Sequence, residues 1–217
     1  MLKFLAIQGA VFLLSTPLAR HVVDAAFLRQ GRGRQLAALY ALGNILGVNR
    51  LTDGIMLTDK AEESLRSLIY EIAAKSSKLT PSGLFMSVLK QETEIRLAAY
   101  RLITVLVARP WCLMEICAKQ EIIGIVTDPH NEFTKNGLLA YHFFLNDDFD
   151  SYSSCCMEAR YNCCVAINKA LLSSNNLTNH PSLTEIAGKL HEAVRRGPYL
   201  TRERIEAQPV VVTAERL

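Results

Sequence analysis

Apolar residues recur every three or four positions along most of this chain, a spacing typical of helices that bury one face. The segment from Lys60 to Ala74 shows the pattern clearly, with Leu65, Leu68, Ile69 and Ile72 on one side. Stretches that alternate apolar and polar residues are scarce. The pattern therefore predicts an all-α fold.

Prolines, glycines and capping residues predict where the helices begin and end. Thr16 and Thr80 each precede a proline, an arrangement typical of a helix start, and Gly47 predicts a helix end. Together with the apolar spacing, these signals predict helices over Pro17–Phe27, Gln35–Leu46, Lys60–Ala74, Pro81–Leu89, Glu92–Ala108, Pro110–Val126, Phe133–Leu145, Met157–Leu172 and Leu183–Val194.

The two ends of the sequence differ from this helical middle. Residues 1–19 place Lys3 before an apolar run from Phe4 to Leu14, a pattern similar to a short secretory signal. We interpret this run instead as a first core helix. It is shorter than the roughly 20 apolar residues that cross a bilayer, so no membrane segment is predicted. At the other end, Gly197-Pro198 stops helix formation, and residues 197–217 are predicted to form an extended tail.

One helical pattern recurs about sixty residues along the chain. Glu94-Ile95-Arg96 also returns as Glu158-Ala159-Arg160, at a distance of 64 residues (158 − 94). Each copy carries small residues on its apolar side, as closely stacked helices require. The pattern favours a helical-repeat solenoid over residues 1–196, with chance similarity among amphipathic helices as the alternative. The residues that match at a shift of 60 (98 − 38) are Ala38, Tyr40, Leu42, Ile45 and Leu46 with Ala98, Tyr100, Leu102, Val105 and Leu106.

The charge and aromatic content argue against a nucleic-acid partner. The 217 residues include 24 basic and 21 acidic side chains, a formal net charge of +3, which is too small for a dedicated phosphate-binding surface. Only 7% of the residues are aromatic, so surfaces for stacking bases are scarce.

Six cysteines lie in the second half of the sequence. Two adjacent pairs, Cys155-Cys156 and Cys163-Cys164, fall on or beside one predicted helix, where neighbours point about 100° apart and do not cross-link easily. Cys156 and Cys163 are roughly 10 Å apart, too far to share a zinc ion. We predict small buried side chains in a reducing compartment. The alternative is a small secreted disulfide protein.

No pattern of catalytic residues is recognisable. The chain lacks glycine-rich phosphate loops, a nucleophile elbow and a zinc-protease motif, and its five histidines are dispersed. The acidic residues around Asp147 lack the glycine and glutamate of a calcium loop. We therefore predict no enzymatic activity, no cofactor, no metal and no small-molecule substrate. A cryptic enzyme on a helical fold is the alternative.

Several blocks of the sequence, in order, resemble the plant type of the 26S proteasome non-ATPase regulatory subunit 5 family. None of them is a catalytic motif. The blocks are Ala19–Phe27, Gly33–Leu39 with Gly43, Lys60–Glu63, Ser76–Pro81, Glu94–Arg96, Val107–Arg109 followed by Trp111-Cys112, Met157–Leu172, Arg196–Leu200 and Glu206–Val212.

The resemblance implies the C-terminal half of an armadillo/HEAT-like solenoid. It implies a non-enzymatic chaperone for assembly of the proteasome regulatory particle, bound to an ATPase subunit of the base. The expected location is the cytoplasm, with the nucleus as a further site. Residues 142–154 depart from the family pattern and are expected to form a loop or insertion. The alternatives are a truncated non-functional copy and a generic armadillo-type module with another partner.

The resemblance also predicts which side chains meet the partner. In such arrays the second helix of each pair lines the concave face. We take the repeated helix as this second helix. Aromatic and arginine side chains, which it carries, are frequent interface anchors. The non-packed positions predicted to bind the partner are Tyr40, Asn44, Tyr100, Arg101, Thr104, Asn168 and Lys169.

Overall fold

The computed structural model describes residues 9–28, 31–47, 58–131, 148–174 and 181–199. Within these ranges the chain is almost entirely helical and contains no strand, so the predicted all-α fold is confirmed. A short helical segment over residues 9–14 comes first. The helices that follow are α2 (Pro17–Phe27), α3 (Arg32–Leu46), α4 (Asp59–Lys75), α5 (Pro81–Leu89), α6 (Thr93–Leu106), α7 (Pro110–Ala118), α8 (Gln120–Thr127), α10 (Asp148–Ser173) and α11 (Pro181–Arg196).

Local signals set most helix ends where the sequence predicts them. The Thr80 hydroxyl accepts a hydrogen bond from the Gly83 backbone N–H at 3.2 Å and caps α5, whose first residue is a proline. Gly47 ends α3 in the left-handed region, with φ of 98°. Thr16 precedes α2 as predicted, but its hydroxyl donates to the Leu13 carbonyl and does not cap the helix.

Two boundary predictions are wrong. The predicted helix Pro110–Val126 is two helices, because Lys119 adopts an extended conformation (φ −108°, ψ 90°) between α7 and α8. The loop predicted over residues 142–154 is helical from residue 148, where α10 begins nine residues before the predicted start (157 − 148). Residues 142–147, the predicted helix Phe133–Leu145 and the tail from residue 200 lie outside the described residues.

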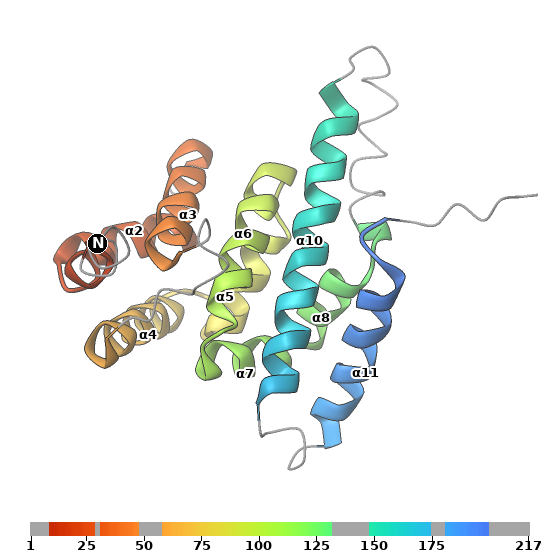
Figure 1. The fold of residues 1–217 in the computed structure, drawn as a ribbon. Coiled ribbons are helices and arrows are strands. Elements are labelled where there is room, and N and C mark those ends of the chain that lie inside the picture. Colours follow the sequence, from red (N-terminus) through yellow and green to blue (C-terminus); the bar gives the residue numbers. More distant parts are fainter. Residues whose placement is uncertain (1–8, 29–30, 48–57, 132–147, 175–180, 200–217) are drawn as a thin grey trace, which may run out of the picture.

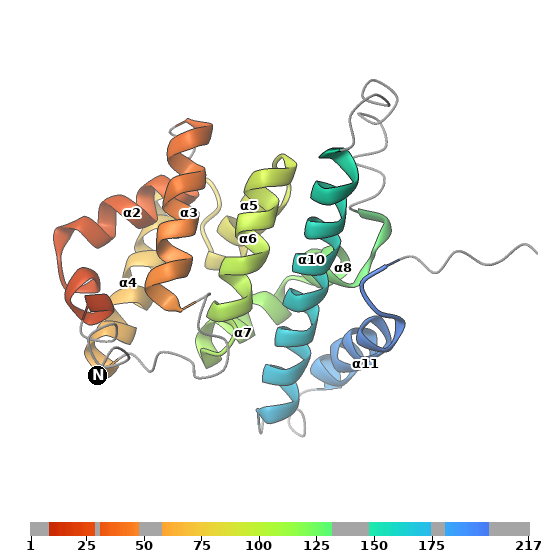
Figure 2. The same ribbon diagram turned by 45° about the horizontal axis from the view of Figure 1, so that its top comes forward.

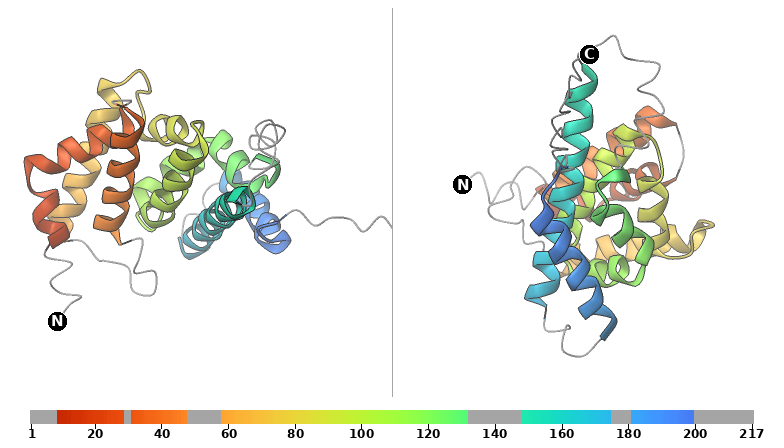
Figure 3. Two further views of the ribbon diagram at one scale, coloured as in Figure 1. Left: turned by 90° about the horizontal axis from the view of Figure 1, so that it is seen from above. Right: turned by 90° about the vertical axis from the view of Figure 1, so that its right-hand side faces the viewer.

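Three helices far apart in the sequence lie side by side. Helix α6 lies between α3 and α10 (Figures 1 and 2). Helix α2 packs on α3, α5 packs on α6, and α8 and α11 pack on α10. Seen from above, α2, α3, α6, α10 and α11 follow one another across the molecule in that order (Figure 3). The middle helix, α6, therefore packs against three other helices, α3, α10 and α5.

Each helix of this layer carries a buried polar side chain that donates to a backbone carbonyl earlier in the chain, in two cases at the C-terminal end of a preceding helix. Gln35 donates from Nε2 to the carbonyl of Ala26 in α2 at 3.1 Å. The guanidinium of Arg96 donates to the Gln91 carbonyl, just beyond α5, at 2.8 Å. A third tie runs from Arg160 on α10 to a carbonyl in the last turn of α8, at 2.6 Å. The last carbonyls of a helix lack partners within it, so these bonds satisfy groups that burial would otherwise leave unpaired.

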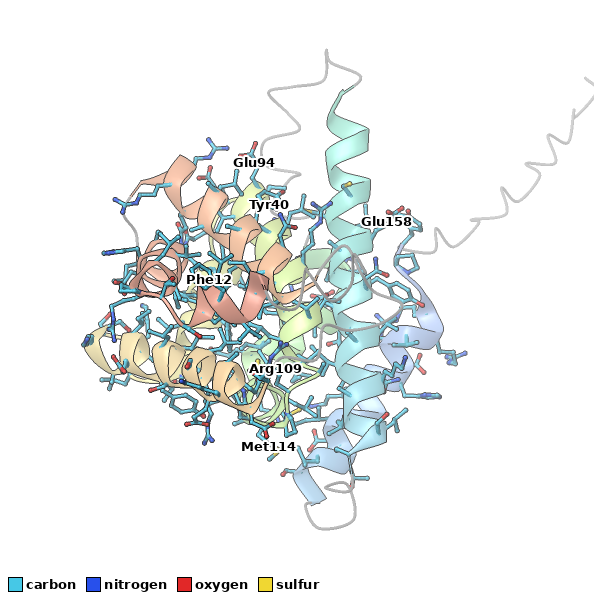
Figure 4. All side chains as sticks on the ribbon, turned by 60° about the vertical axis from the view of Figure 1, so that its left-hand side comes forward. Phe12, Tyr40, Glu94, Arg109, Met114 and Glu158 are labelled. Atoms are coloured by element: carbon cyan, nitrogen blue, oxygen red, sulfur yellow. The ribbon has the colours of Figure 1, made fainter. Side chains whose placement is uncertain are left out.

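A further polar contact connects α4 to the corner between α6 and α7. The Arg109 guanidinium pairs with the Glu62 carboxylate at 2.9 Å, and the Trp111 indole N–H donates to the same carboxylate at 3.2 Å. Arg109 is nearly buried and lies low in the array in Figure 4. This contact holds the first turn of α4 against a helix that is more than forty residues away in sequence.

Five of the six cysteines are buried, as predicted, and Cys155 is exposed. Cys156 and Cys163 are fully buried on the side of α10 that packs against α6, where Cys156 Sγ lies 3.7 Å from the Thr93 carbonyl. Burial raises the pKa of Cys117 and Cys164 to about 11. Small sulfur-containing side chains therefore let α10 lie close to its neighbours.

We expect one thiol to react quickly with a disulfide reagent such as DTNB in the folded protein at pH 8. The thiolate is the reactive species, and burial keeps the other five thiols inaccessible to the reagent. All six should react in denaturant, and Cys155→Ser should abolish the fast phase. Two or more fast thiols in the folded protein would contradict this packing of α10.

Candidate functional site

A groove of about 500 Å³ opens over α6, between α3 and α10. In Figure 4, Tyr40 on α3 and Glu158 on α10 mark its two sides. Three helices from distant parts of the sequence are therefore needed to build it. The lining residues are Leu39, Tyr40, Gly43, Asn44, Ala98, Arg101, Leu102, Thr104, Val105, Cys155, Glu158, Ala159 and Asn162.

The floor of the groove is apolar and built from short side chains. Gly43 of α3, Ala98 of α6 and Ala159 of α10 are all buried there, and Leu102 adds a fully buried branched side chain. Small residues allow the three helices to approach closely. They also leave room above the floor for side chains of another molecule.

One rim carries an arginine stacked on a tyrosine. The Arg101 guanidinium lies 5.9 Å from the centre of the Tyr40 ring, which is 36% exposed. This contact is a cation–π interaction, worth about 0.5–1 kcal/mol at an exposed site. Arg101 is half-buried and forms no ion pair with any described residue. The rim therefore presents a positive charge that this part of the chain does not neutralise.

The opposite rim carries a carboxylate that already has a hydrogen-bond donor. The Tyr199 hydroxyl donates to Glu158 Oε1 at 2.6 Å, and the neighbouring Pro198 carbonyl accepts from Arg160 at 3.0 Å. These two bonds fix the residues after α11 beside the groove. Exposed Cys155 lies on the same helix one turn before Glu158.

The structure brings four of the seven predicted partner-binding residues together. Tyr40, Asn44, Arg101 and Thr104 all line the groove. Lys169 is exposed but lies outside the groove lining. That these residues bind a partner stays a prediction.

The expectation that Tyr100 and Asn168 lie on a non-packed face is wrong. Tyr100 is fully buried and Asn168 is 8% exposed. The physical reason is the position of each helix in the layer. Tyr40 belongs to α3, which packs against α2 and α6, whereas the matching Tyr100 belongs to α6, which packs against α3, α10 and α5. Asn168 belongs to α10, which is covered by α6, α8 and α11.

Sequence reasoning missed the contribution of α10 to the groove. Cys155, Glu158 and Asn162 were absent from the predicted set, although the repeated Glu-x-Arg pattern had singled out Glu158. The helix was expected to begin at Met157, so Cys155 fell outside it. A correct start for α10 would have placed these residues one turn apart on the same helix.

A second groove, of about 660 Å³, lies between residues 14–20 and α4 and is more open to solvent. Its arginine is already paired, since Arg20 contacts the Glu71 carboxylate at 2.7 Å. That hydrogen bond and charge hold the pKa of Glu71 below its usual range. The groove over α6 is the stronger candidate because its arginine has no such carboxylate partner among the described side chains.

The groups at the groove over α6 are those of a binding surface. It combines an apolar floor, a stacked cation and a carboxylate. Among the described residues, no three His, Cys, Asp or Glu side chains lie close enough to hold a metal ion. No helix within these residues has both the length and the hydropathy that crossing a membrane requires.

No protein-family model, curated protein or solved structure matches this chain. The resemblance described above therefore rests on its sequence blocks alone.

We expect the two matching tyrosines to respond very differently to truncation. Tyr100→Ala removes a fully buried aromatic ring and should lower the free energy of unfolding by about 3–5 kcal/mol. Tyr40→Ala removes a partly exposed ring and should cost about 1 kcal/mol or less. Urea unfolding followed by circular dichroism measures both values. Equal losses would contradict the position of α3 at one side of the layer.

Proposed function

We propose that this protein is a non-enzymatic helical-repeat scaffold that binds a segment of a partner protein in the groove over α6. The observation that carries the proposal is the combination of an apolar floor with the stacked, unneutralised Arg101 on its rim. Tyrosine and arginine are among the residues that contribute most to binding energy at protein interfaces. A groove of this composition suits a peptide segment better than a small polar metabolite.

The armadillo/HEAT-like solenoid is part of this proposal. It is supported by the side-by-side packing of α3, α6 and α10 and by the buried polar side chain with which each of them donates to a backbone carbonyl earlier in the chain. The tying residues Gln35, Arg96 and Arg160 are separated by 61 (96 − 35) and 64 (160 − 96) positions. Equivalent contacts at near-equal intervals are expected when similar helical units are stacked.

The sequence resemblance supplies the first partner to test. On that basis we propose a chaperone role in assembly of the proteasome regulatory particle, through binding of an ATPase subunit of the base. Two alternatives remain, namely a truncated copy without function and an armadillo-type module with another partner. The groove is the same surface in the second alternative, so a single set of variants separates all three.

The test is capture of partners from cell extract by the tagged chain, with identification by mass spectrometry. We expect base ATPase subunits without the proteolytic core. Arg101→Glu combined with Tyr40→Ala should reduce capture at least about tenfold, because it removes both rim anchors. The matched control is Arg66→Glu with Tyr70→Ala, since Arg66 lies 5.7 Å from the centre of the Tyr70 ring on α4, outside the groove.

The possible outcomes are distinct. Base ATPase subunits that are lost with the groove variant and kept with the control support the full proposal. Unrelated partners with the same dependence support the generic module. Capture of general chaperones alone supports the truncated copy. Partners retained equally by both variants, in proteins with unchanged circular dichroism, would show that the groove is not the binding surface.

A further inference from the structure

We infer that the groove over α6 selects partner segments in which an acidic side chain neighbours an apolar one, with Arg101 binding the carboxylate. This inference rests on the proposed function and adds the chemistry of the partner. It follows from the position of Arg101, which lines the groove beside the Tyr40 ring and forms no ion pair with another described side chain.

Covering the Arg101 cation with a partner costs free energy, because the guanidinium loses water. A partner seated in the groove removes water from the half-buried Arg101 guanidinium. A charged group that loses water without gaining an acceptor is strongly destabilising. No carboxylate whose side chain the structure describes pairs with Arg101, so an acidic side chain of the partner would give this cation its acceptor.

The chemistry of the guanidinium favours a carboxylate over an amide. Arg101 carries five N–H donors in one plane and no acceptor, and its cation–π contact, 5.9 Å from the centre of the Tyr40 ring, is compatible with donation by these groups to a partner. A carboxylate accepts two such parallel bonds, whereas a neutral amide accepts with one oxygen. The stacked arrangement therefore discriminates acidic side chains from their amide counterparts.

The charges on the two rims orient the partner segment across the groove. Glu158 lies on the opposite rim and already accepts a hydrogen bond from Tyr199, so its negative charge disfavours a second carboxylate on that side. The acidic side chain is thus directed toward Arg101 and α3. The floor between them, which includes Ala98 and Ala159, accepts the neighbouring apolar side chain.

The experiment begins with selection from a random 12-residue peptide library displayed on phage. The immobilised proteins are the wild type, Arg101→Gln and Arg66→Gln, the last of which alters the matched arginine–tyrosine pair on α4. We expect Asp or Glu next to an apolar residue to be enriched on the wild type and on Arg66→Gln. The acidic enrichment should be lost on Arg101→Gln.

A selected peptide is then compared with a version in which the amide replaces the acidic residue. Together with Arg101→Gln, this comparison completes a double-mutant cycle. We expect wild type to bind the acidic peptide at least about tenfold more tightly, and Arg101→Gln to bind the two peptides about equally. Alkylation of Cys155, which lines the groove and is exposed, tests independently whether the peptide binds in the groove. A bound peptide should slow that reaction.

Two results would overturn the inference in different ways. Peptides that protect Cys155 but show no acidic preference, or the same preference on Arg101→Gln, contradict the carboxylate assignment and leave the groove as a binding site. If no selected peptide protects Cys155, the groove itself is contradicted, and the proposed function fails with it. Circular dichroism of each variant shows that the loss is not one of folding.

Discussion

The packing of α6 between α3 and α10 is the constraint on which the rest of this structure depends. Ten of its fourteen residues are buried, because helices cover it on both sides and α5 packs against it as well. Close approach on both sides requires small residues at the contacts. The alanines of α6 and the buried cysteines of α10 meet this requirement, and Ala98 of α6 with Ala159 of α10 also forms part of the floor of the groove.

Polar contacts at the helix ends set how the helices are placed along this layer. Gln35, Arg96 and Arg160 are almost completely buried. Gln35 and Arg160 donate to carbonyls near the ends of α2 and α8, and Arg96 donates to the Gln91 carbonyl in the connection between α5 and α6. Removing one side of such a buried contact leaves a polar group without its partner, which costs about 1–3 kcal/mol or more for a charged group. These contacts therefore favour one arrangement of α3, α6 and α10 over others in which the helices slide past one another. The groove has its shape because that arrangement is fixed.

Local features of the fold were predictable from sequence, and features that depend on neighbours were not. Pro81 and Gly47 set helix ends through their own backbone preferences, so α5 and the end of α3 lie where predicted. The break at Lys119 has no proline or glycine to indicate it. Alignment of the repeated pattern correctly grouped Tyr40 and Arg101, but it gave Tyr100 the exposure of Tyr40. Exposure depends on how many helices surround a position, and a repeat pattern does not contain that information.

The central claim is that the groove over α6 is the surface that meets a protein partner. Hydrogen exchange followed by mass spectrometry, on the free chain and on the captured complex, tests it most directly. The account predicts slower exchange in the complex for segments of α3 around Tyr40 and of α10 around Glu158, with α4 unchanged. Slower exchange confined to α4 and α7, or none at all in a complex that remains intact, would contradict it.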